Sequence, residues 1–157
     1  MNKKIVKYEI NYQIDSLKLM KRQAMKIDSK LFSAIRSRLK NGTMTGNLDI
    51  LFLIIQKKYE LEKGEIFKSP REFWETNGDC DCQAIFFASY FLYCGFLPSD
   101  LYFVLADENG SGWHHVFLVN RALKNNKKAL DCLPGYTYTD YNLTKYKYRK
   151  YYRVDKL

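Results

Sequence analysis

Residues 78–95 read GDCDCQAIFFASYFLYCG, and this stretch decides which fold class the sequence predicts. After Cys80, apolar residues recur every three or four positions, which predicts a buried helix over residues 80–94. Gly95 is expected to end this helix, because glycine adopts the left-handed conformation of a helix C-terminus without a steric penalty. Cys80 is therefore expected in the first turn of a buried helix.

Downstream of this helix the apolar period changes to two. Residues 101–106, 113–120 and 128–132 alternate in this way, which predicts three strands. The turn-rich residues 107–112 and the polar residues 122–126 separate them. Helices thus precede an antiparallel sheet, and the predicted fold class is α+β.

The residues upstream are mainly helical in pattern. Residues 16–39 predict one amphipathic helix, or two joined near Asp28-Ser29, where either residue could cap the second helix. Residues 49–62 predict another helix, and residues 69–79 predict a short turn-rich segment. Ile5, Tyr8, Ile10 and Tyr12 alternate imperfectly with polar residues, which predicts a short N-terminal strand or extended arm.

Length and composition predict one domain. The chain has 157 residues, of which 46% are hydrophobic, enough for a single core. No stretch has the pattern of a signal peptide or the length of a membrane span, so we expect a cytoplasmic protein without membrane contact. Its four cysteines are then reduced thiols, and their spacing lacks the paired C-x2-C pattern of common zinc sites. We expect no metal and no cofactor.

The net charge of +9 is concentrated at the two ends. Residues 1–40 carry eleven Lys and Arg against three Asp and Glu, and residues 121–157 carry ten against three. Seven tyrosines lie among the cations of residues 136–153, a pattern that can stack bases and hold phosphates. The alternative is an exposed terminal strand with solvating lysines. We favour this second interpretation and expect only weak, salt-sensitive binding of nucleic acid.

Cys80, a histidine and Asp131 follow one another in the order nucleophile, base, orienter. A cysteine at a helix N-terminus, a histidine on a strand and a carboxylate at a strand end are the parts that thiol acyl transfer needs. The helix terminus favours the thiolate, whereas Asp79 and Asp81 disfavour it, so the sulfur needs a cationic partner. The chain has only two histidines, His114 and His115.

These two histidines must point to opposite faces of their strand. His115 shares its face with Trp113, Phe117 and Val119, the bulkier set, and we expect the Cys80 helix to cover that face. This favours His115 as the base. Asp131 shares its face with Ala129 alone, where its carboxylate could hold the second nitrogen of the imidazole.

At these residues the sequence resembles the transglutaminase-like superfamily, in particular its small bacterial and phage-type domains. The matching segments are Gly78-Asp79-Cys80-Asp81-Cys82, His115-Val116-Phe117 and Leu130-Asp131-Cys132-Leu133-Pro134, with Tyr59 and Ile66–Arg71 leading into the first. The resemblance covers roughly residues 45–135. Residues 1–44 and 136–157 would then be extensions of a single domain that spans residues 1–157.

The resemblance implies a papain-like core with Cys80 as nucleophile, His115 as base and Asp131 as orienter. It also implies attack on a protein or peptide amide through a thioester, released by water or by an amine, with hydrolysis as our default. The sequence departs from the family pattern at Cys82, which replaces an aspartate, and at Pro134, which comes two residues late. The alternative is a catalytically silent binding module of a phage or mobile-element assembly.

The backbone N–H of Cys80 could be one oxyanion donor, because it lies at a helix start. For the second donor the sequence offers Trp74, Asn77 and Gln56 without choosing among them.

Overall fold

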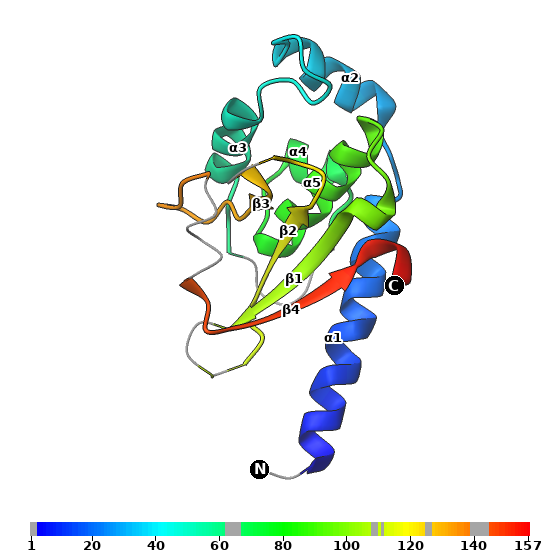
Figure 1. Ribbon diagram of the computed structural model, residues 1–157, viewed down its shortest axis with the longest axis vertical. Helices are drawn as coiled ribbons and strands as arrows, with labels where there is room; N and C mark the ends of the chain where they lie inside the picture. The colour runs from blue at the N-terminus through cyan, green and yellow to red at the C-terminus, as the bar shows by residue number, and fades with distance from the viewer. Residues whose placement is uncertain (1–2, 62–66, 108–109, 111, 125–126, 139–144) are drawn as a thin grey trace.

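The fold was obtained as a computed structural model, which describes residues 3–61, 67–107, 110, 112–124, 127–138 and 145–157 (Figure 1). Side chains are described from residue 14 onward. The helices are α1 (Lys3–Ala24), α2 (Ser29–Arg38), α3 (Leu48–Lys57), α4 (Pro70–Glu75) and α5 (Cys80–Tyr93). The strands are β1 (Leu101–Asp107), β2 (His115–Asn120), β3 (Ala129–Leu130) and β4 (Tyr148–Arg153), and short 3-10 helices form η1 (Pro98–Asp100) and η3 (Val154–Lys156).

The four strands form one antiparallel sheet in the order β3-β2-β1-β4. Phe103 of β1 faces Leu118 of β2, which in turn faces Leu130 of β3. The last strand, β4, pairs with β1 and forms one edge of the sheet. Helices precede the sheet along the chain, and the predicted α+β class is confirmed.

The α5 helix packs on one face of the sheet and forms the centre of the core (Figure 1). Ten consecutive residues of this helix, Cys82–Phe91, are buried, so it is covered on every side. Such a helix needs cover all round, and α1, α2 and α4 also contact it. Phe86 lies where these layers meet, with its ring next to those of Phe32, Phe73 and Trp74.

The prediction of which sheet face α5 covers was wrong. Val116 and Leu118 share the core of α5, whereas Phe117 and Val119 belong to a second, smaller apolar cluster. The strand alternates as expected, but Val116 and Leu118 are as apolar as their neighbours. The bulk of the side chains therefore could not identify the face that the helix covers.

Some element boundaries also differ from the prediction. Residues 5–12 belong to α1 and not to a strand, because the helical spacing of Leu17 continues back through Ile14 and Ile10. Residues 70–75 form α4, which starts at a Ser69 cap followed by a proline in the first turn. The helix predicted to reach residue 62 ends at Lys57, and residues 62–66 lie outside the described residues.

The joint predicted near Asp28 is confirmed. Two helices meet there, and the Asp28 side chain accepts a hydrogen bond from the backbone N–H of Leu31. This is the usual N-cap contact.

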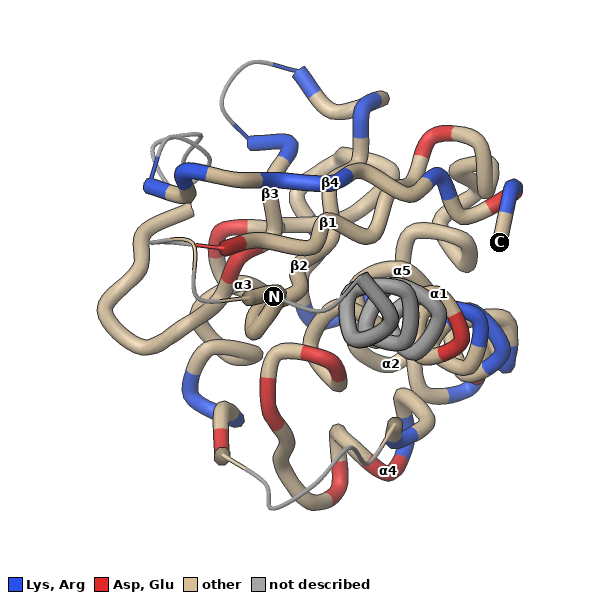
Figure 2. The backbone as a smooth tube through the Cα atoms, turned by 90° about the horizontal axis from the view of Figure 1, so that it is seen from below, with Lys and Arg blue, Asp and Glu red and all other residues tan. Residues whose placement is uncertain are grey.

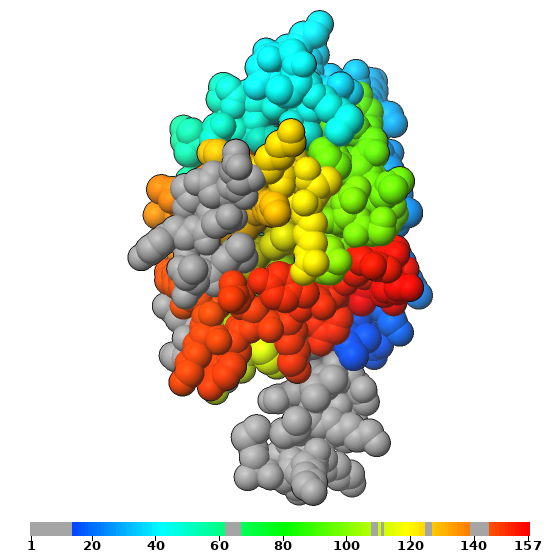
Figure 3. Space-filling model, viewed as in Figure 1, coloured from blue at the N-terminus to red at the C-terminus, as the bar shows by residue number. Residues whose placement is uncertain are grey.

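The described part of the basic C-terminal segment includes β4 at the edge of the sheet. Lys and Arg follow one another along β4, which crosses the face seen in the space-filling view (Figures 2 and 3). The two ends also meet, since Lys21 Nζ of α1 donates to the Leu157 carbonyl at 2.8 Å. No helix among the described residues is both long and apolar enough to cross a membrane.

Candidate active site

Gly78 allows the chain that precedes α5 to pass close to the first turn of this helix. Its N–H donates to the Lys58 carbonyl at 3.1 Å, and its carbonyl accepts from the Glu60 N–H at 2.8 Å. A Cβ atom at this position would lie 2.6 Å from Cβ and 2.8 Å from Sγ of Cys82. Only glycine fits between this two-stranded bridge and the first turn of the helix, so Gly78 sets where Cys80 begins α5.

The Cys80 sulfur lies at the edge of β2, just beyond the end of β3. Asn120 donates its N–H to Lys128 on the β3 side of the strand, and in an antiparallel ladder Val116, four residues away, presents its N–H to the same side. There β3 has already ended, and the Val116 N–H is close enough to lower the pKa of the Cys80 thiol. The thiol thus lies near the residue that follows His115.

The surroundings of Cys80 favour its neutral thiol over the thiolate. Burial raises the pKa of the Cys80 thiol well above its ordinary value, repulsion by Asp81 adds to this, and the Val116 hydrogen bond opposes it. The thiol also contacts Asp81 Oδ1 at 3.9 Å. The favourable effect of the helix terminus is therefore outweighed, and the proton has to be removed by a base.

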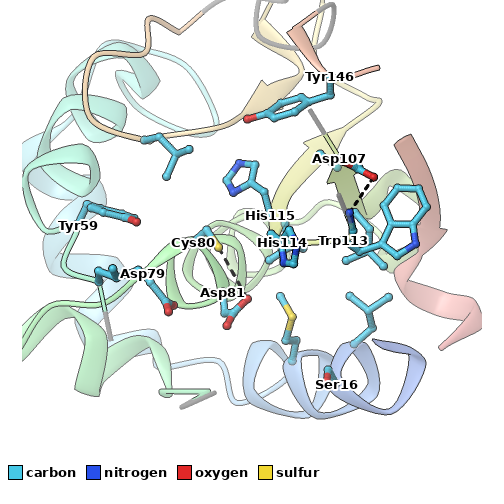
Figure 4. A pocket seen from close by; sticks show the side chains of 18 of the residues that line it. Ser16, Tyr59, Asp79, Cys80, Asp81, Asp107, Trp113, His114, His115 and Tyr146 are labelled. Carbon is cyan, nitrogen blue, oxygen red and sulfur yellow. Dashed lines mark hydrogen bonds between the residues drawn. The ribbon is translucent and has the colours of Figure 1, made fainter. Parts of the chain in front are cut away.

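His115 is paired with Asp131, as the order of the motifs predicts. Its Nε2 lies 2.7 Å from Asp131 Oδ1, and the Asp131 side chain is 1% exposed. Since Asp131 accepts from Nε2–H, Nδ1 is the ring nitrogen that can take a proton. Cys80, His114 and His115 all line one cavity of about 520 Å³ (Figure 4).

Tyr146 contacts both members of the His115–Asp131 pair. Its hydroxyl donates to the second carboxylate oxygen of Asp131 at 2.7 Å, and its ring lies 5.4 Å from the ring of His115. Burial, and then the negative charge of Asp131, raise the pKa of Tyr146, so the hydroxyl keeps its proton and remains a donor. Tyr146 follows a polar segment and gave no signal in the sequence for such a contact.

Two glutamine amides, of which that of Gln83 is buried and that of Gln56 is partly buried, hold the segment that carries Asp131. Gln83 of α5 donates to the carbonyls of Ile55 and Cys132, at 3.2 and 3.3 Å. Gln56 of α3 donates to the carbonyls of Leu133 and Tyr136, at 2.8 and 2.7 Å. Gln56 is thus engaged in holding the chain, which argues against it as an oxyanion donor. Nothing in the spacing of the sequence pointed to either contact.

The other two donors considered for the oxyanion also lie elsewhere. Trp74 stacks on Phe86 and Asn77 donates to Glu60 at 3.4 Å, and neither lines the cavity. Tyr59 does line it, and its hydroxyl points toward Cys80 (Figure 4). Burial raises the pKa of Tyr59, and the negative charge of Asp79 adds to this effect, so this hydroxyl stays protonated.

The first turn of α5 also offers donors to the cavity. Asp79 is the N-cap residue of α5, and its side chain makes no capping hydrogen bond. Asp79, Cys80 and Asp81 line the cavity, so the start of the helix forms part of its wall. The first N–H groups of a helix have no partner within the helix.

The four cysteines are free thiols in different surroundings. Cys80 is partly exposed, whereas Cys82, Cys94 and Cys132 are buried. In the part of the chain that the structure describes, no three His, Cys, Asp or Glu side chains gather as a metal site would require. The described residues therefore contain no cluster that matches the zinc site considered from the cysteine spacing.

Comparisons of the chain with protein-family models, with curated proteins and with solved structures find no match.

Proposed function

We propose that this protein is a cysteine-dependent acyl-transfer enzyme of transglutaminase-like type, which cleaves amide bonds in proteins or peptides. The observation that carries the proposal is the hydrogen bond between His115 and Asp131, because His115 lines one cavity together with a partly exposed cysteine at a helix start. A papain-like core, with the nucleophile helix packed on an antiparallel sheet, belongs to the same proposal.

In the proposed reaction the Cys80 sulfur attacks the amide carbonyl carbon while the thiol proton passes to Nδ1 of His115. Asp131 stabilises the imidazolium that forms. The C–N bond then breaks, His115 returns the proton to the leaving amine, and a thioester to Cys80 remains. Water, deprotonated by His115, releases the acid and restores the thiol. The Cys80 N–H and the Tyr59 hydroxyl are the donors that would bind the oxyanion.

We favour hydrolysis over amine crosslinking because the domain is small. One cavity of about 520 Å³ receives the acyl group, and a chain of 157 residues leaves little material for a separate amine channel. Water is therefore proposed as the acceptor.

Acylation by p-nitrophenyl acetate tests the proposal, because this small activated ester can acylate a reactive thiol whatever the natural substrate is. The sulfur forms a bond to the acetyl carbon, p-nitrophenolate leaves as the coloured anion, and the thiol proton remains on His115. We expect the original protein to release p-nitrophenolate in a fast phase and to carry an acetyl group on Cys80, which peptide mass spectrometry would detect. Cys80→Ala should abolish the fast phase.

The adjacent histidines provide a matched pair of variants. His115→Gln should slow acylation at least a hundredfold, as expected for loss of a general base. His114→Gln should leave it within a few-fold of the original rate. The reverse result would transfer the role of base to His114, and equal rates for both would contradict base catalysis by either.

A further inference from the structure

The hydroxyl of Tyr146 belongs to a chain of hydrogen bonds that begins at the surface and ends at His115. Lys145 Nζ lies 2.8 Å from the Tyr136 hydroxyl, and the Tyr136 and Tyr146 hydroxyls are 3.1 Å apart. Tyr146 then reaches Asp131 Oδ2 at 2.7 Å, while Asp131 Oδ1 meets His115. A cation thus stands at one end of the chain and an imidazole at the other.

The direction of each bond in this chain follows from the chemistry of its members. An ionised carboxylate can only accept, so Tyr146 spends its one proton on Asp131. The Tyr146 oxygen must then accept from Tyr136, whose own oxygen accepts from Lys145, which can only donate. Every donor points toward Asp131, so each bond favours the negative charge on that carboxylate.

Tyr146 also restricts the movement of the His115 ring. The two rings are 5.4 Å apart at an angle of 32°, and Phe117 lies 5.7 Å from both of them. His115 is 13% exposed and Tyr146 is 5% exposed, so little water reaches the bond between His115 and Asp131. A hydrogen bond is stronger in such a site than in water.

We propose that Tyr146 is a positioning residue of the active site, which fixes the Asp131 carboxylate and covers the His115–Asp131 bond. The inference rests on the proposed function of Cys80, His115 and Asp131. It gives the Tyr- and Lys-rich C-terminal segment a role in the reaction: this segment supplies the residue that makes the orienter rigid. Tyr136 and Lys145 support Tyr146 from the solvent side.

Tyr146→Phe tests the inference because it removes the hydroxyl and keeps the ring. The rate constant for acylation of Cys80 by p-nitrophenyl acetate is expected to fall about ten- to a hundredfold, the effect of a lost hydrogen bond to a charged group. The ester concentration that gives half the maximal rate should not change, because the variant keeps the Tyr146 ring that lines the cavity and removes only the hydroxyl bonded to Asp131.

Tyr138→Phe is the matched control. The Tyr138 hydroxyl donates to the Lys127 carbonyl at 2.7 Å and the residue is 7% exposed, so the variant also removes a buried, hydrogen-bonded hydroxyl. It should lower thermal stability about as much as Tyr146→Phe and leave acylation unchanged. Equal loss of acylation in both variants would overturn the inference, since it would show an effect of stability alone.

Proton NMR can test the contact between Tyr146 and Asp131 without a measurement of activity. The proton on His115 Nε2 should give a downfield imidazole signal in the proton NMR spectrum, and His114→Gln assigns it because the chain has only two histidines. Tyr146→Phe should shift or broaden this signal, Tyr136→Phe should do so more weakly, and Tyr138→Phe should not affect it. An unchanged signal in Tyr146→Phe would overturn the inference.

Different results would refute the role of Cys80 as nucleophile and the role of Tyr146 as positioning residue. If Cys80→Ala keeps the acylation rate, the nucleophile is wrong and the proposed function fails. If Cys80→Ala abolishes acylation and Tyr146→Phe leaves both the rate and the NMR signal unchanged, the function stands and the role of Tyr146 is refuted.

Discussion

Replacement of Asp131 by asparagine separates the charge of this residue from its hydrogen bonds. Asp131 is 1% exposed and accepts at 2.7 Å from both His115 Nε2 and the Tyr146 hydroxyl. Asparagine has the same shape, and its oxygen can still accept from His115. Its amide group would face Tyr146, whose hydroxyl can rotate and accept instead of donating. Neither neighbour is then left without a partner.

The geometry therefore predicts a small effect on stability and a large one on the reaction. Asp131→Asn should change the free energy of unfolding by no more than about 1.5 kcal/mol. Asp131→Ala leaves both His115 and Tyr146 unsatisfied at about 1–3 kcal/mol each and should cost roughly 2–6 kcal/mol. Because asparagine cannot stabilise an imidazolium by charge, acylation of Cys80 should fall roughly 10²- to 10⁴-fold in Asp131→Asn, about 2.7–5.5 kcal/mol of transition-state stabilisation.

Urea unfolding and the rate of p-nitrophenolate release measure the two effects separately. Asp155→Asn is the control, because Asp155 pairs with Arg153 at the surface, outside the cavity, and its loss removes one charge without touching Asp131. An Asp131→Asn variant that reacts within tenfold of the original protein would refute the role of the charge. One as unstable as Asp131→Ala would refute the argument that asparagine satisfies both neighbours.

Three further predictions concern the helix start, the thiol and the basic ends. Gly78→Ala should lower the free energy of unfolding by about 1–3 kcal/mol in urea, because its Cβ would lie 2.6 Å from that of Cys82, and an unchanged value would contradict the close approach. Labelling by iodoacetamide should reach Cys80 before the three buried cysteines, and its rate should still rise above about pH 8.5 because the pKa of Cys80 is raised; a plateau near pH 6 would instead indicate a thiolate at rest. Duplex and single-stranded DNA should bind negligibly at about 0.15 M salt, whereas tight binding that is lost in Tyr148→Ala would identify nucleic acid as a partner.

The sequence predicted those features that depend on a residue and its near neighbours in the chain. The start of α5 at Cys80 and the joint near Asp28 follow from local rules of capping, although either Asp28 or Ser29 could have been the cap. The order of the motifs predicted the pairing of His115 with Asp131, which the structure has, whereas the argument from the covered sheet face was wrong. The exposed terminal strand was also expected, and β4 occupies an edge of the sheet with Tyr148 and Tyr151 exposed.

The contacts that the sequence could not reveal join segments far apart in the chain. Gln56 and Gln83 reach carbonyls 77 and 49 residues away, and a buried amide has no periodicity that would announce its partner. Tyr146 and Tyr138 are buried, so neither is available to stack on a base, although both lie in the segment whose composition resembles a nucleic-acid surface. Composition describes a segment as a whole, whereas the described tyrosines of this segment differ from one another in burial.

Burial of Cys80 also determines when charge appears in the cavity. Desolvation and Asp81 keep the thiol protonated at rest, although Asp131 and Tyr146 are already arranged around His115. A raised pKa of the thiol favours proton transfer to His115 during attack over a thiolate–imidazolium pair formed beforehand. Thiolates are the form of cysteine that oxidants attack, so a neutral thiol would also be the less easily oxidised form. Asp79 and Asp81, which looked unfavourable for a nucleophile in the sequence, then help to keep the resting thiol neutral.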